Sequence, residues 1–141
     1  MRQYLPKALE DEGITRERYQ ELLAICRQYR EYKRIIRRFE TGTANRPERR
    51  RGPGSWKRPD PTGNAAAAVA DATAYYRARV KLIDGCARAA AGSAVAPALI
   101  ECVTEGHAFE TLKHRPPCGR QMFYRLRLLF FVLLDERLRT P

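Results

Sequence analysis

The chain has 141 residues, of which 44% are hydrophobic, so it can bury a core and is not disordered throughout. It carries 27 Lys and Arg against 16 Asp and Glu, a formal net charge of +11. This excess indicates a polyanionic partner, with nucleic acid ahead of a membrane surface or an acidic protein, but it implies no sequence specificity.

The N-terminal segment, residues 1–40, is expected to form a basic amphipathic helix. It runs from about Thr15 to Phe39, with Thr15 as the N-cap and a short helical turn before Gly13. Its apolar residues alternate three and four apart, which is the period of one helical face. They are Leu22, Ile25, Tyr29, Tyr32, Ile36 and Phe39.

Basic residues repeat on the same rhythm along the opposite face of this helix: Arg27, Arg30, Arg34 and Arg37. A charged face usually serves only to keep a helix solvated. Here the stretch from Arg27 to Arg38 holds six basic residues and one acid, Glu31. Contact with a nucleic-acid backbone is therefore an equal alternative, and we include the four arginines among the predicted phosphate contacts.

Residues 41–63 are expected to be a basic linker, because their prolines disfavour helix and central strand. The linker either follows a DNA backbone or is disordered, and the sequence does not separate the two. Trp56 is expected to anchor this loop against the core, with base stacking as the alternative. The predicted backbone contacts in the linker are Arg49, Arg50, Arg51, Lys57 and Arg58.

A long central helix is expected over residues 64–92, beginning after Asp60-Pro-Thr62. Its apolar positions again alternate three and four apart: Val69, Thr73, Tyr76, Val80, Ile83, Ala87 and Ala90. This helix is long enough to pair with the first one. The two helices are expected to form a hairpin or a dimerisation surface.

The last segment, residues 93–141, is expected to fold as a helix-turn-helix domain. Helices are predicted over about 94–105, over about 108–114, and from Cys118-Gly119 to about Arg139, with Pro116-Pro117 enforcing the turn before the last one. Cys118 stands where a better capping residue is usual. The predicted buried stripe of the last helix consists of Phe123, Leu126, Phe130, Leu133 and Leu138.

The first two turns of this last helix carry donors on the side expected to face solvent. Arg bonds bidentately to guanine and Gln to adenine in the major groove, and a helix-turn-helix presents such residues at the start of its second helix. The predicted DNA contacts are Arg115, Arg120, Gln121, Tyr124, Arg125 and Arg127.

These residues also suggest a family. The stretch from Ala98 to Leu138, with Cys118-Gly-Arg-Gln-Met-Phe-Tyr-Arg-Leu-Arg and a Leu-Asp-Glu-Arg-Leu ending, resembles phage late-transcription regulators of the RinA/ArpU type. The resemblance implies a helix-turn-helix like that of sigma factor region four, with Gly119 to Arg127 as the reading helix. It further implies double-stranded DNA and the host RNA polymerase as partners. The arginine-rich linker and the Ala-rich central helix depart from this pattern.

The four cysteines are scattered without a C-x-x-C pair, which indicates free thiols in a reducing cytoplasm. Two of them lie within 17 residues together with both histidines, but at spacings that match no common zinc finger, so we predict no metal and no other cofactor. These residues are Cys102, His107, His114 and Cys118. The first 12 residues are mixed polar and charged, unlike a signal peptide, and the longest apolar run, Leu128–Leu134, is too short to span a membrane. A soluble protein of the bacterial host cytoplasm is expected.

The sequence thus predicts an all-α protein, a long helical hairpin followed by a helix-turn-helix bundle. Enzyme signatures such as a P-loop or H-E-x-x-H are absent, so we do not expect an enzyme. The leading hypothesis is a DNA-binding activator of late genes. The alternatives are a phage-encoded inhibitor of a host or defence protein such as an RNA-guided nuclease, and a small packaging subunit. A homodimer is also expected, because the two long helices and the last helix together carry more apolar surface than a small bundle can bury. The apolar residues of the last helix that contribute to this surplus are Leu128, Leu129, Phe131 and Val132.

Overall fold

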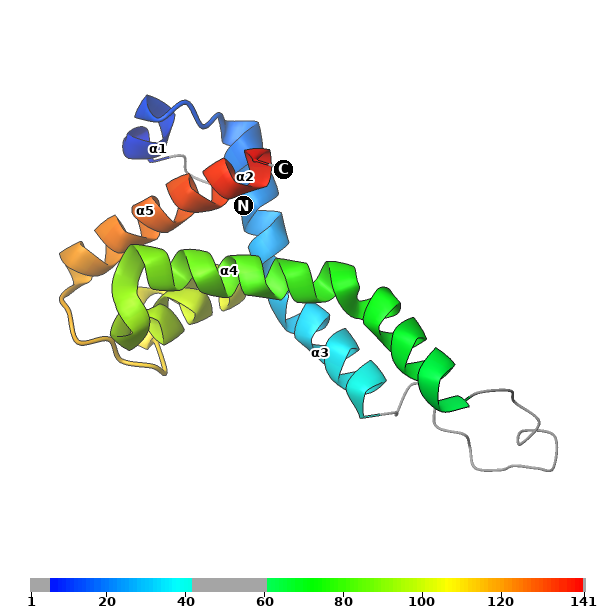
Figure 1. The fold of residues 1–141 in the computed structure, drawn as a ribbon. Coiled ribbons are helices and arrows are strands. Elements are labelled where there is room, and N and C mark those ends of the chain that lie inside the picture. Colours follow the sequence, from blue (N-terminus) through cyan, green and yellow to red (C-terminus); the bar gives the residue numbers. More distant parts are fainter. Residues whose placement is uncertain (1–5, 42–60, 141) are drawn as a thin grey trace. The chain divides into compact units, whose positions relative to one another are not determined.

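The computed structural model describes residues 6–41 and 61–140, with side chains described from residue 67 onward in the second range. These residues form helices and contain no strand, which confirms the predicted all-α class (Figure 1). The elements are α1 (Lys7–Asp11), α2 (Arg16–Arg27), α3 (Tyr29–Glu40), α4 (Pro61–Glu105), the 3-10 turn η3 (Phe109–Thr111) and α5 (Arg120–Arg139).

The predicted start of the first long helix is confirmed. Gly13, at a φ of 84°, turns the chain between α1 and α2, a conformation that costs glycine little. Thr15 then accepts a hydrogen bond from the backbone N–H of Arg18 at 3.1 Å, which is the bond an N-cap makes.

The expectation of one continuous helix over 15–39 is wrong, because the chain bends at Gln28 into α2 and α3. Gln28 has φ −92° and ψ 1°, and its N–H bonds to the carbonyl of Ile25 at 3.2 Å. The apolar stripe continues on both sides of the bend but meets different partners. Tyr19 of α2 packs on Phe131 of α5, whereas Tyr32 of α3 packs on two tyrosines of α4. A bend allows each half of the stripe to face its own partner.

Helix α4 includes a break at Gly92, whose φ of 83° and ψ of 163° lie outside the helical region. The predicted end of the central helix near Ala91 and the start of another near Ala94 are therefore confirmed. By length and composition alone, the part of α4 from Ala67 to Glu105 could cross a membrane, although 56% of its most apolar stretch is buried inside the protein. The core helix of a soluble protein meets the same criterion.

The helices group into two compact units that do not follow the four segments predicted from the sequence. One unit joins residues 1–30 with residues 81–141, and the other comprises residues 31–80. In the second unit, the predicted hairpin is confirmed for α3, the second half of the predicted first helix, which pairs with the first part of α4 (Figure 1). Tyr32 of α3 lies 5.6 Å from Tyr76 of α4 between ring centroids, and Arg77 forms an ion pair with Glu40 at 2.6 Å.

The first unit buries α5 against α1, α2 and α4. Its fully buried large side chains come from all four helices and the turns beside them: Leu9, Ile14, Leu22, Ile83, Leu99, Val103, Phe123, Phe130, Phe131 and Leu134. The predicted stripe of α5 is thus only partly right. Leu126, Leu133 and Leu138 are half-buried, while Phe131, expected to be surplus apolar surface, lies in the core.

Two further expectations about this region are wrong. The middle helix over 108–114 is reduced to η3, because the following residues are held in a loop by a buried carboxylate described below. The N-cap of α5 is Gly119, not Cys118. Gly119 has an extended φ of −83° and provides no side-chain cap.

Candidate nucleic-acid interface

The start of α5 presents three of the predicted DNA-contacting residues to solvent. Arg120, Gln121 and Arg125 are all exposed, while Phe123 between them is fully buried. The core contact of Phe123 fixes the rotation of the helix, so the polar side chains are displayed by a rigid element.

Arg120 makes two surface contacts. Its Nε donates to Glu110 Oε2 at 2.7 Å, and its guanidinium lies 5.4 Å from the centre of the Tyr124 ring. Both members of the ion pair have more than half of their side chain exposed, at 65% and 58%. Such a pair contributes at most about 1 kcal/mol, so a phosphate can replace Glu110 at low cost.

Tyr124 holds the local structure together, unlike the freely exposed residue that was predicted. It is half-buried, and its hydroxyl accepts a hydrogen bond from the backbone N–H of Phe109 at 3.0 Å. Its ring also packs edge-on against Phe123. Tyr124 therefore ties η3 to α5, and its hydroxyl is engaged within the protein.

Arg127, also predicted as a DNA contact, is half-buried and makes contacts within the protein. Its Nη1 donates to the hydroxyl of Tyr19 at 3.1 Å, and its guanidinium lies 4.9 Å from the centre of the Phe131 ring. Both partners are buried in the core. Arg127 therefore joins α2 to α5 through contacts within the protein.

A groove of about 570 Å³ runs along the start of α5. It is lined by Pro6, Tyr19 and six residues of α5: Arg120, Gln121, Tyr124, Arg125, Arg127 and Leu128. The exposed donors thus stand at the rim of a concave surface. Arg115, in the loop before α5, is exposed and has its guanidinium 6.0 Å from the centre of the Phe109 ring.

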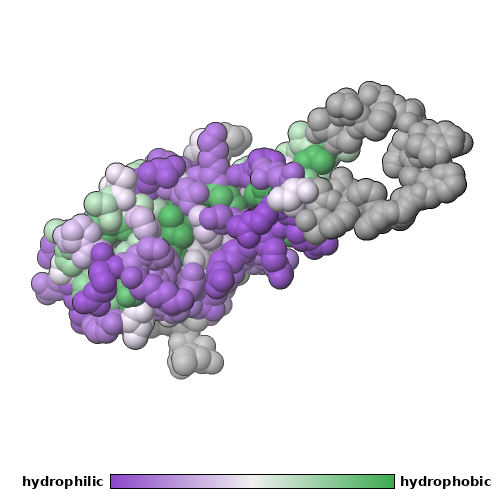
Figure 2. Space-filling model, turned by 90° about the horizontal axis from the view of Figure 1, so that it is seen from below, coloured by the Kyte–Doolittle hydropathy of each residue, from purple (hydrophilic) through white to green (hydrophobic). Residues whose placement is uncertain are grey.

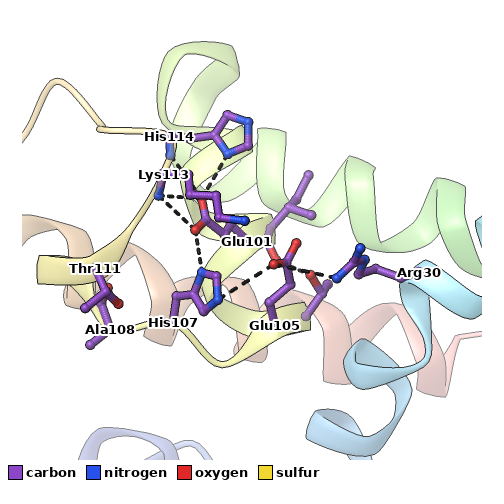
Figure 3. A network of polar contacts seen from close by, with 10 residues as sticks. Arg30, Glu101, Glu105, His107, Ala108, Thr111, Lys113 and His114 are labelled. Atoms are coloured by element: carbon purple, nitrogen blue, oxygen red, sulfur yellow. Dashed lines mark hydrogen bonds and ion pairs between the residues drawn. The ribbon is translucent and has the colours of Figure 1, made fainter.

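The loop that leads to α5 is anchored by Glu101, a residue that the sequence analysis missed (Figure 3). Its side chain is 2% exposed, and it accepts the backbone N–H groups of Lys113 at 2.9 Å and of His114 at 3.0 Å. Both imidazoles also contact it, His107 through Nδ1 at 2.5 Å and His114 through Nδ1 at 2.9 Å. The signal that could have revealed Glu101 is its position, a lone acid on the buried face of an apolar helix.

This network keeps the carboxylate ionised. Burial by itself raises the pKa of Glu101, but the hydrogen bonds from His107 and from the Lys113 and His114 residues outweigh it and lower the pKa to about 2. Glu105 extends the network on the surface, lying 3.8 Å from His107 Nε2 and 3.8 Å from Arg30 (Figure 3). Within the described ranges, no group of three or more His, Cys, Asp or Glu residues is arranged to hold a metal ion.

The predicted phosphate contacts outside α5 are exposed where the structure describes them. Arg27 ends α2, whereas Arg30, Arg34 and Arg37 share one face of α3, and all four are exposed. Arg34 pairs with Glu31. Figure 2 shows hydrophilic residues over much of the visible face, with apolar residues between them. The linker arginines and Lys57, residues 49–58, lie outside the described residues.

No protein-family model, curated protein or solved structure matches this chain.

Proposed function

We propose that the protein is a DNA-binding transcriptional regulator that reads duplex DNA with the first half of α5. The observation that supports this most is the exposure of Arg120, Gln121 and Arg125 on a helix whose opposite face is locked into the core. These are the side chains that form bidentate contacts with guanine and adenine. The net charge of +11 supplies the attraction to phosphate that any such contact needs.

The N-terminal end of α5 adds a second contribution. Because Gly119 has no side chain to cap the helix, the first backbone N–H groups of α5 are open to an external acceptor. A DNA phosphate is a suitable acceptor at a helix N-terminus. Lys113 and Arg115, both exposed in the preceding loop, are further phosphate donors. In this proposal Glu101 sets the path of the loop, and therefore the place of these donors.

The regulatory role is proposed from the resemblance of residues 98–138 to late-transcription activators. It implies that the protein acts in the cytoplasm of a bacterial host and recruits the host RNA polymerase. The number of apolar residues in the helices separately predicts that the protein binds its DNA site as a homodimer. Blocking an RNA-guided nuclease and packaging DNA are the other roles considered, and the experiment below separates DNA reading from protein binding.

The test begins with selection of a preferred duplex from a random library, followed by affinity measurements by fluorescence anisotropy. Arg120→Ala and Gln121→Ala should each weaken binding to the selected site by about 1–3 kcal/mol and change binding to random duplex little. Glu110→Gln should tighten binding to both duplexes, because it removes a negative charge that repels phosphate, and should tighten the selected site more, because it also frees Arg120. Arg88→Ala, an exposed arginine of α4, is the matched control.

If Arg120→Ala weakens binding to the selected and the random duplex equally, Arg120 contacts a phosphate and does not read a base. A library that yields no preferred sequence, with no variant affecting duplex binding, would overturn the proposal and direct the search to a protein partner.

A further inference from the structure

The unit of residues 31–80 carries most of the excess charge of the protein. Its sequence contains 12 Lys and Arg against 5 Asp and Glu, a net charge of +7, whereas the other 91 residues have a net charge of +4. Within the described part of this unit the exposed basic residues include Lys33, Arg34, Arg37 and Arg38 on α3. The proposed reading helix α5 belongs to the other unit, so the proposed reading of bases uses this charge only as a general attraction to phosphate.

The same unit displays the most exposed large hydrophobic residue among those described. Tyr75 of α4 is 55% exposed, although aromatic side chains usually bury most of their surface. Its ring is nevertheless held in place. It contacts Tyr32 and Tyr76 in edge-on geometry, with ring centroids at 6.0 and 5.5 Å.

Arg79, one helical turn further along α4, fixes the ring from a third side. Its guanidinium lies 5.3 Å from the ring centre, and its Nε donates to the Tyr75 hydroxyl at 3.3 Å. A rigid, solvent-exposed aromatic ring beside a guanidinium can stack on a flat group with little loss of conformational entropy.

We propose that this surface, Tyr75 with Arg79 and Tyr32, binds single-stranded nucleic acid by stacking an unpaired base on the Tyr75 ring. Aromatic rings accept any unstacked base in this way, while basic side chains contact the backbone. The exposed basic side chains described on α3 of the same unit favour a polyanionic partner, and a nucleic acid is the polyanion that also offers flat groups to stack. Paired bases offer no free face, so the proposed ligand is a single strand. The site is separate from α5 and does not depend on the proposed reading of duplex DNA.

The experiment measures the affinity of the full-length protein for a fluorescein-labelled 20-nucleotide oligothymidine and for a 20-base-pair duplex. Tyr75→Ala should weaken binding of the single strand by about tenfold, within the range of alanine substitutions at stacking sites. Tyr75→Phe, which keeps the ring, should bind within about twofold of the wild type. Leu129→Ala removes an exposed apolar residue of the other unit and should have no effect.

A photo-crosslink from 5-iodouracil within the oligonucleotide provides a readout that needs no variant, and Tyr75 should be the crosslinked residue. Unchanged single-strand affinity in Tyr75→Ala would overturn the proposal. So would an equal loss on duplex, which would indicate a backbone contact, or an absence of any single-strand binding, which would favour a protein partner. Arg120→Ala should leave single-strand affinity unchanged, so failure at this site and failure at α5 are distinguishable.

Discussion

Replacing Glu101 by Gln tests whether one buried carboxylate holds the loop that precedes α5. The substitution keeps the shape of the side chain but removes its charge. It also replaces one carboxylate oxygen by an NH₂ group, which cannot accept the hydrogen bonds that Lys113, His107 and His114 donate to the carboxylate. We therefore expect a large loss of stability at neutral pH.

The magnitude follows from the lowered pKa. A fall from the usual 4.5 to about 2 corresponds to about 3 kcal/mol of stabilisation of the folded state by the ionised carboxylate. Because the pKa is lower in the folded protein, this contribution is complete above pH 4.5 and is lost as the pH falls toward 2. The variant should thus be less stable than the wild type by about 3 kcal/mol at pH 7, and the difference should shrink in that window.

The assay is urea unfolding followed by circular dichroism at a series of pH values from 7 to 2. Glu105→Gln is the control, because its contacts with His107 and Arg30 are both 3.8 Å long and its loss should cost less than about 1 kcal/mol. If the free energies of unfolding of the wild type and Glu101→Gln differ by the same amount at every pH, this network does not lower the pKa of Glu101.

Three further outcomes are expected. Arg127→Ala should lower the free energy of unfolding by about 2–4 kcal/mol in a urea titration because it leaves the Tyr19 hydroxyl buried without its donor, whereas a change of similar size in the exposed Arg125→Ala would contradict this view. Gly92→Ala should lower the free energy of unfolding by about 1–3 kcal/mol, measured by thermal melting, because its φ of 83° is strained for alanine. Gly119→Ala should be nearly neutral, because φ there is −83°, and no atom lies within 4 Å of the new Cβ at either position. Equal effects of the two substitutions would argue against backbone strain. In the native protein Cys118, half-buried, should react first with a thiol reagent at pH 8, because burial raises the pKa of Cys26 to about 12 and also raises those of Cys86 and Cys102; rapid loss of all four thiols would disprove it.

The helices could be predicted from the sequence because their apolar residues repeat at the helical period. Glycines indicate the turn at Gly13 and the break at Gly92. The bend at Gln28 has no such mark, since neither Gly nor Pro is near it. In α5 the stretch from Leu126 to Leu134 is apolar on nearly every side, so periodicity could not choose Phe131 over Leu126 for the core. The structural contacts of Tyr124 and Arg127 could not be predicted for another reason. Both are long amphipathic side chains, and Arg127 finds its partner 108 residues away in the chain.

The joining of residues 1–30 with residues 81–141 has a consequence for biosynthesis. Arg18 of α2 bonds to Asp135 of α5 at 2.6 Å across 117 residues of sequence, so α2 has no final packing surface until nearly the whole described chain has left the ribosome. The hairpin of residues 31–80 depends on contacts nearer in sequence and can form while synthesis continues. The emerging chain would therefore carry a finished basic hairpin and, at the same time, an amphipathic N-terminal helix whose apolar face is exposed. A chaperone or a nascent-chain partner has its best opportunity to act in that interval.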